Sequence, residues 1–243
     1  MNKKILLAIL MIMLVLSFAA AQVNGPDPTK TGVTSAQQKL KEVSISKFEN
    51  AGFWYGIFPR DDGLMFLRSF PGSPLDKEAL PEEVEAGIVT LDQDGMIMEG
   101  DNYVLGAKVY FFRRGVINFA IKPVRPLPVE GITKTISIWV CGRNTNHRME
   151  IVLSDHFGND AVIDMGKLNF MGWKRLTVAV PPNIVQRDYH YNNKMGVSVS
   201  AFNIKCDLDE TYGNYYLYFD DLRAVTDLFA EANRDEDDMV DSW

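Results

Sequence analysis

Short segments in which apolar and polar side chains alternate follow one another along most of the chain beyond residue 103. The clearest of them, Thr133 to Cys141, alternates Ile, Ile and Val with Ser, Trp and Cys. A period of two is typical of a strand with one buried face. Because no long helical pattern separates these segments, the sequence predicts an all-β, jelly-roll-like β-sandwich. Strands are expected at 103–113, 116–122, 133–141, 148–154, 161–164, 173–180, 195–205 and 215–224.

The part of the chain before residue 103 gives weaker signals. The segment Phe53 to Phe70 is rich in aromatic residues and is interrupted by Asp61-Asp62-Gly63, which predicts two strands joined as a hairpin. The proline- and glutamate-rich stretch from Pro71 to Glu85 is expected to be a long surface loop, with one helical turn at Pro81 to Glu85.

The two ends of the chain differ in composition from the middle. Residues 1–21 have a basic start, an apolar run and Ala19-Ala20-Ala21, the pattern of a secretory signal peptide that leaves Gln22 as the mature N-terminus. No later stretch is long and apolar enough to span a membrane. We therefore expect a signal peptide (1–21), a flexible leader (22–42), the β-sandwich (43–225), and a short C-terminal helix with an acidic tail (226–243).

Net charge and missing motifs exclude several functions. The whole chain has a net charge of −7, and without residues 1–21, which hold two lysines and no acid, the charge is −9. Such acidity argues against a nucleic-acid partner, because phosphate binding needs an excess of Lys and Arg. Motifs of common hydrolases, metalloproteases and phosphate-binding loops are missing from the sequence. We therefore expect a protein that is not an enzyme.

Two segments of opposite charge are candidate partner-binding regions. Between Asn102 and Val129 there are five bases and no acid, whereas residues 227–243 hold seven acids and one arginine. Complementary charges on one molecule favour repeated head-to-tail association, although an ordinary surface with a solvated tail is the simpler alternative. The candidate residues are Lys108, Arg113, Arg114, Lys122 and Arg125 in the basic strip, and Asp235, Glu236, Asp237 and Asp238 in the acidic tail.

A structural calcium ion and a disulfide are the other features considered. Glu49 near the start of the sandwich and Asp220 and Asp221 at its end would meet if the first and last strands were neighbours. The alternative is favoured, because calcium needs six to eight oxygen ligands and these acids can equally face water or cap the next segment. In an oxidising compartment Cys141 and Cys206 either form a disulfide or remain two buried small residues.

Several motifs are distributed over most of the mature chain. They include Pro128-Val129-Glu130-Gly131-Ile132, Gly172-Trp173-Lys174-Arg175-Leu176 and Tyr218-Phe219-Asp220-Asp221-Leu222. Together these motifs resemble one known family, the spirochaete flagellar filament outer-layer (sheath) proteins, or FlaA family. The resemblance implies an exported, periplasmic, non-enzymatic protein that requires no cofactor.

The same resemblance implies a mechanical role and a set of partners. Such a protein would coat the flagellin core of periplasmic flagella, contact core flagellin and other sheath proteins, associate with itself along the filament, and set filament stiffness and helical shape. The competing hypothesis is a periplasmic carbohydrate-binding module, because the expected sandwich is also of the carbohydrate-binding-module or galactose-binding-like kind. In that case the loop Tyr189 to Asn193 and the end at Asp220 and Asp221 would be its sites.

Overall fold

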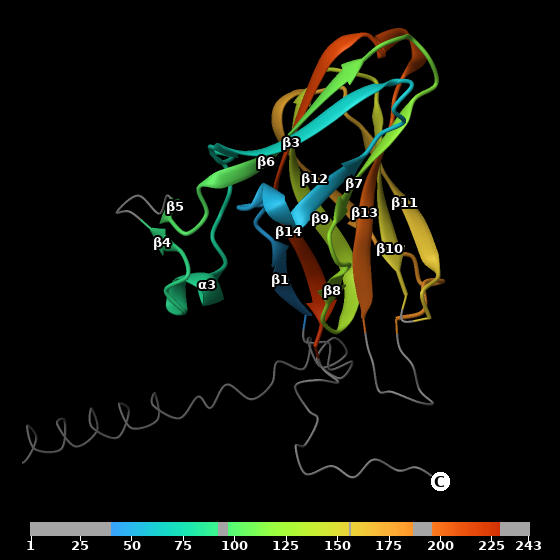
Figure 1. Cartoon of the computed structure of the whole chain (residues 1–243). Helices are drawn as coiled ribbons and strands as arrows, with labels where there is room; N and C mark the ends of the chain where they lie inside the picture. Colours follow the sequence, from blue (N-terminus) through green and yellow to red (C-terminus); the bar gives the residue numbers. More distant parts are fainter. Residues whose placement is uncertain (1–39, 92–96, 156, 187–195, 229–243) are drawn as a thin grey trace, which may run out of the picture. The chain divides into compact units, whose positions relative to one another are not determined.

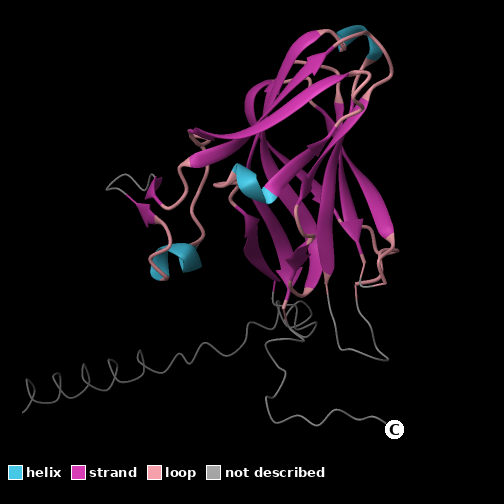
Figure 2. Ribbon diagram, in the orientation of Figure 1, coloured by secondary structure: helices cyan, strands magenta, loops and turns pink. Residues whose placement is uncertain are grey.

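The protein is an antiparallel β-sandwich, as the sequence predicts. The computed structural model describes residues 40–91, 97–155, 157–186 and 196–228, and within them most residues lie in strands (Figures 1 and 2). Two sheets, called here A and B, each contain six strands in this part of the chain. No helix among the described residues is long and apolar enough to cross a membrane.

Sheet A has the strand order β12-β9-β14-β6-β3, and β1 pairs with the second half of β14. Its strands are β1 (Leu40–Ser46), β3 (Gly63–Pro71), β6 (Tyr103–Phe111), β9 (Ile132–Arg143), β12 (Met171–Ala179) and β14 (Gly213–Asp227). The 15-residue β14 is central and pairs with β6, β9 and β1.

Sheet B has the order β11-β10-β13-β7-β2, and β8 pairs with the start of β13. Its strands are β2 (Trp54–Ile57), β7 (Asn118–Pro123), β8 (Leu127–Val129), β10 (Arg148–Ser154), β11 (Asp160–Lys167) and β13 (Val197–Lys205). The remaining elements are η1 (Ala51–Phe53), α3 (Pro81–Glu85), η2 (Leu208–Glu210) and the small pair β4 (Thr90–Leu91) and β5 (Ile97–Glu99). The helical turn expected at Pro81 to Glu85 is confirmed by α3.

The core lies between the two sheets and is formed by the apolar positions of the alternating strands. On β9, Ile136, Ile138 and Val140 are fully buried in it. Four aromatic rings join the sheets, because Phe48, Trp54 and Phe219 all pack around Phe202 with ring centroids 5.9 to 6.3 Å away. The side chains that point inward from the two sheets are therefore the apolar ones that the alternating sequence pattern predicts.

One expectation about pairing is wrong. The segments on either side of Asp61-Asp62-Gly63 do not form a hairpin: β2 pairs with β7 in sheet B, whereas β3 pairs with β6 in sheet A. The chain likewise changes sheet between β6 and β7. Alternation identifies strands but not their partners, and in a jelly-roll-like sandwich successive strands often lie in opposite sheets.

The limits of the sandwich also extend beyond the expected 43–225. Strand β1 begins at Leu40, inside the expected leader, and pairs Leu40 with Asp227. Strand β14 includes Thr226 and Asp227, so the expected short helix does not begin there. The start of β1 and the end of β14 pair through their backbone groups, and this pairing lengthens both strands. The signal peptide and residues 229–243 lie outside the described residues.

Candidate functional site

One of the three acids considered for a calcium site, Asp220, lies beside a buried lysine. The ammonium of Lys77 contacts Asp101 Oδ2 at 2.7 Å and Asp220 Oδ2 at 2.8 Å, and all three side chains are at most 2% exposed. We call Lys77, Asp101 and Asp220 the Lys77 cluster. Lys77 and Asp101 come from the long segment between β3 and β6, and Asp220 comes from the middle of β14. A calcium ion at this point would have to displace the ammonium group.

The other two acids considered for calcium have further hydrogen-bond partners of their own, although both lie close enough to interact electrostatically with Lys77 and Asp101. Asp221 accepts a hydrogen bond from Arg223 Nε at 2.7 Å, and Glu49 accepts one from the Tyr103 backbone N–H at 3.1 Å. Asp221 has a positive φ of 49° and lies at an irregularity in the pairing of β14 with β9. Among the described residues, no group of three or more His, Cys, Asp or Glu is arranged to hold a metal.

The Lys77 cluster is part of a larger set of contacts that fixes the segment between β3 and β6 to sheet A. Lys47, just after β1, pairs with Glu83 of α3 at 2.9 Å. Arg223 of β14 donates a hydrogen bond to the backbone oxygen of Glu78. Because these charges are buried, their pairing is required for this segment to pack where it does.

Two carboxylates share one ammonium in the Lys77 cluster, which gives the cluster a pH dependence. Burial raises the pKa of Asp220 to about 7, against the opposing attraction of Lys77. A folded-state pKa above the unfolded value means that stability is lost as pH rises through the folded pKa. His147 acts in the opposite direction, because burial lowers its pKa, but its opposing effect is small until the pH falls to its ordinary value of about 6.5.

We therefore expect the free energy of unfolding to increase when the pH is lowered from about 8 to about 6.5. The Asp220→Asn variant should lose most of this increase, because its side chain does not titrate. Urea unfolding curves of both proteins across this interval test the expectation. Equal pH slopes for the two proteins would contradict it.

The two cysteines are both buried and free, so the disulfide considered above is not formed. Cys141 lies on β9 next to Val140, whose side chain is in the core, and therefore points to the outer side of sheet A. Cys206 follows β13 of sheet B and belongs to the core. The backbone of sheet A separates the two sulfur atoms.

Both thiols should be unreactive in the folded protein. Burial raises the pKa of Cys206 to about 12 and also raises that of Cys141, where Arg143 opposes the effect. Only thiolates react readily with alkylating reagents. We expect no labelling by iodoacetamide under native conditions and two labels after unfolding without reductant, measured by intact mass. An oxidised mass, lower by two hydrogens and resistant to labelling, would contradict the structure.

The five bases of the predicted basic strip do not form one surface. Lys108 is on the outer face of sheet A, whereas Lys122 on β7 lies opposite Tyr55 in sheet B. Arg113 pairs with Asp62 at 2.6 Å, Arg114 lies over the ring of Tyr212, and Arg125 lines a pocket at the connection between β7 and β8. Bases that are close in sequence are separated here because β6 and β7 belong to different sheets. The acidic tail residues Asp235, Glu236, Asp237 and Asp238 lie outside the described residues.

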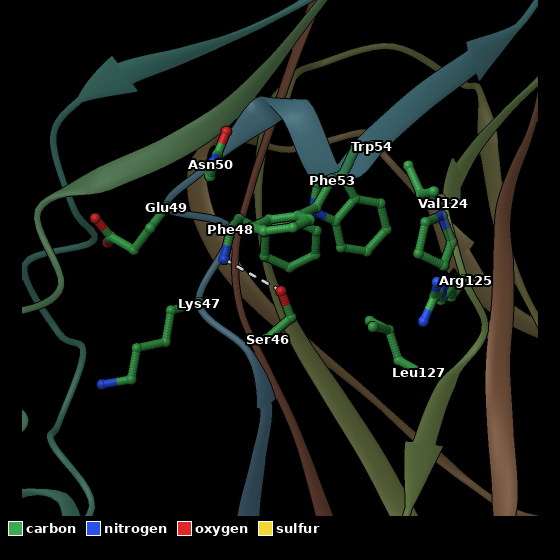
Figure 3. A pocket seen from close by; sticks show the side chains of 11 residues that line it. Ser46, Lys47, Phe48, Glu49, Asn50, Phe53, Trp54, Val124, Arg125 and Leu127 are labelled. Atoms are coloured by element: carbon green, nitrogen blue, oxygen red, sulfur yellow. Dashed lines mark hydrogen bonds between the residues drawn. The ribbon is translucent and has the colours of Figure 1, made fainter.

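A mostly apolar pocket of about 570 Å³ was not anticipated from the sequence (Figure 3). It is formed by residues 46–50 after β1, by Phe53 and Trp54, and by residues 123–125 and 127 between β7 and β8. Phe48 has a positive φ of 60°, rare for a bulky residue, and its ring stacks on Trp54 at 4.6 Å. Sequence inspection can identify the aromatic residues, but segments about 75 positions apart meet only in the fold.

The fold and the Lys77 cluster define the class of protein. It is an antiparallel β-sandwich in which a buried charge cluster holds the long segment between β3 and β6 to sheet A. Some solved structures are similar in fold, including a carbohydrate-binding module in complex with β-1,4-galactotriose (TM-score 0.39, 12% identity, 76% of this chain and 99% of that chain). A family 11 carbohydrate-binding module of Clostridium thermocellum gives a TM-score of 0.40 at 10% identity, covering 76% and 96% of the two chains. Similarity at this level carries no inference about a ligand.

Sequence comparison gives the family. The model of the family described as flagellar filament outer layer protein FlaA matches residues 18–234, and the chain belongs to this family. A flagellar filament outer layer-like protein of Brachyspira hyodysenteriae is 39% identical over 214 residues, which are 88% of this chain and 92% of that protein. The flagellar filament outer layer protein of Spirochaeta aurantia is 26% identical over 175 residues, 57% of this chain and 52% of that protein's length.

Proposed function

We propose that this protein is a subunit of the outer layer of periplasmic flagellar filaments, where it coats the core of flagellin. The observation that supports this proposal most directly is the family match over nearly the whole mature chain. The export signal expected in residues 1–21 would deliver the protein to the periplasm. In this role the protein needs no catalytic group, and core flagellin, other sheath proteins and further copies of itself are its partners.

The proposed role is mechanical. A coat of folded sandwiches bound to a filament increases the filament's resistance to bending and favours the helical shape to which the coat fits best. For this, each subunit must make contacts that repeat along the filament without closing into a ring. A sandwich whose segments are joined by buried ion pairs is suited to transmit such force without rearranging.

The test of this role compares flagellar filaments from cells with and without the gene for this chain. We expect filaments that lack the protein to be thinner and to bend more easily, measured as diameter and persistence length in electron micrographs. Restoring the gene should restore both. Filaments of unchanged diameter and persistence length would contradict the proposal.

A second candidate function, carbohydrate binding, is favoured by one observation: the pocket lined by Phe48, Phe53 and Trp54 (Figure 3). Aromatic rings can serve as platforms for sugar rings. The loop Tyr189 to Asn193, also considered for this role, lies outside the described residues. A glycan array with the mature protein separates the hypotheses, because binding that disappears in a Phe53→Ala variant would favour the carbohydrate-binding module.

A further inference from the structure

The outer side of sheet A carries an exposed aromatic and cationic surface near its β3 edge. Strand register places Phe66, Lys108 and Tyr216 side by side across β3, β6 and β14, and places Arg68 and Tyr218 in the next row on either side of Gly106. Phe70 and Tyr218 pack over Gly106, where a Cβ atom would lie 2.6 Å and 3.1 Å from their rings. We call this surface the aromatic–cation face: Phe66, Arg68, Phe70, Lys108, Tyr110 and Tyr216, bordered by Arg143.

The aromatic side chains of the face are open to solvent. Phe66 is 58% exposed and Tyr110 43% exposed, and the side chains of Phe70 and Tyr216 are also exposed. Strand β3 is at the edge of the sheet, so its outer backbone groups are unpaired by any other described strand. Contiguous exposed aromatic side chains on an edge strand mark a surface that binds another chain.

The cations of the face are not neutralised. Arg68, Lys108 and Arg143 lie 5.8, 5.7 and 5.4 Å from the ring centroids of Phe70, Tyr216 and Tyr218, and within the described residues none of the three forms an ion pair. Some exposed bases elsewhere on the sandwich do have acidic partners, such as Arg148 with Asp164 and Lys205 with Glu150. The face therefore presents positive charge and aromatic surface together, a combination suited to an acidic segment that also contains apolar residues.

The chain itself contains such a segment. Residues 229–243 hold six acids and one arginine, together with Phe229, Met239, Val240 and Trp243. We infer that this segment of one copy binds the aromatic–cation face of a second copy. The inference rests on the proposed outer-layer function and specifies the contact by which its subunits associate.

The geometry of β14 favours binding between copies in a row. Tyr216 of the face lies near the start of β14, and Asp227 is the last residue of this strand. Eleven residues at about 3.3 Å each separate the two by about 35 Å, so the acidic segment leaves the sandwich far from the face. A donor site and an acceptor site at opposite ends of a subunit give a heterologous contact, which propagates along a filament instead of closing.

Sedimentation velocity of the mature chain tests this inference through charge reversal. The face variant carries Arg68→Glu and Lys108→Glu. The tail variant carries Asp235→Lys, Glu236→Lys, Asp237→Lys and Asp238→Lys. The combined variant carries both sets. A control with Lys122→Glu and Arg125→Glu makes the same change of charge on the sheet B side of the predicted basic strip.

At low ionic strength the unmodified chain should form a concentration-dependent series of oligomers, which salt weakens. The face variant and the tail variant should each lower the association constant by roughly tenfold or more. The combined variant should associate again, as should an equimolar mixture of the face variant with the tail variant. The control should behave like the unmodified chain.

Four results would overturn the inference. A chain that is monomeric at every concentration has no such contact or folds its segment onto its own face. A control that loses association as strongly as the face variant shows only a general effect of charge. A tail variant that still associates shows that something other than the acidic segment binds the aromatic–cation face. If the combined variant does not recover association, direct pairing between the acidic segment and the face is excluded. None of these results bears on whether the chain is found on filaments, which tests the proposed function separately.

Discussion

Replacing Lys77 by methionine is expected to destabilise the protein by about 3–5 kcal/mol, because it removes the ammonium that pairs with two buried carboxylates. Among the described residues Asp220 has no other ion-pair partner, whereas Asp101 keeps only the more distant Lys47, whose Nζ is 3.7 Å away. The measurement is the free energy of unfolding from chemical denaturation with fluorescence detection. The segment between β3 and β6 should be the first to become sensitive to proteolysis.

Lys41→Met is the matched control for this prediction. Lys41 also pairs with a carboxylate, Glu82 at 2.6 Å, but the side chain of Glu82 is 64% exposed. Water can replace the lost partner there, so the expected cost is below about 1 kcal/mol. Adding Asp101→Asn and Asp220→Asn to the Lys77→Met variant should recover part of the lost stability. Similar costs for Lys77→Met and Lys41→Met would show that burial of the Lys77 cluster does not increase the cost of losing its lysine.

Phe202→Ala is expected to cost about 3–5 kcal/mol, as for other large aromatic side chains removed from a packed core. Phe202 is fully buried on β13 and its ring contacts those of Phe48, Trp54 and Phe219. These contacts join the end of β1 and strand β14 to sheet B, so the cavity would lie where the sheets meet. Denaturant unfolding monitored by tryptophan fluorescence measures the loss, since Trp54 is next to the cavity.

Phe66→Ala removes the same side chain from the outer face of sheet A. Because Phe66 is largely exposed, its removal should change the free energy of unfolding by about 0.5 kcal/mol or less. The same variant should weaken association between copies if the aromatic–cation face binds the acidic segment. A stability cost comparable to that of Phe202→Ala would contradict the assignment of Phe66 to an exposed surface.

The positions of the strands were predictable where apolar and polar side chains alternate along the sequence. The segment Thr133 to Cys141 predicts β9 within two residues at each end, because every second side chain is buried in the core. The partner of each strand was not predictable, since the Asp61-Asp62-Gly63 turn favours a hairpin locally although the sandwich separates β2 from β3. Local turn chemistry does not determine which sheet receives the next strand.

The functional surfaces were predictable only in part. The acidic residue Asp220 was identified as a site for a cation, but its cation is Lys77, 143 positions away in the sequence. The five bases of the basic strip were identified in the sequence, but the prediction that they form one surface was wrong. Alternation of side chains along each strand and the change of sheet between β6 and β7 separate bases that are close in sequence. Arg68 on β3 and Arg143 on β9 complete the charge of the face from strands on either side of β6 and β14, and only the strand order reveals that they belong to one surface.

The most direct test of the account is the composition and structure of native filaments. Filaments isolated gently from the source organism should contain this chain, beginning at Gln22, in near-stoichiometric ratio to core flagellin by quantitative mass spectrometry. Cryo-electron microscopy of the same filaments should show β-sandwiches of this shape in the outer layer. A chain that is abundant in the periplasm but missing from the filaments would contradict the proposed function.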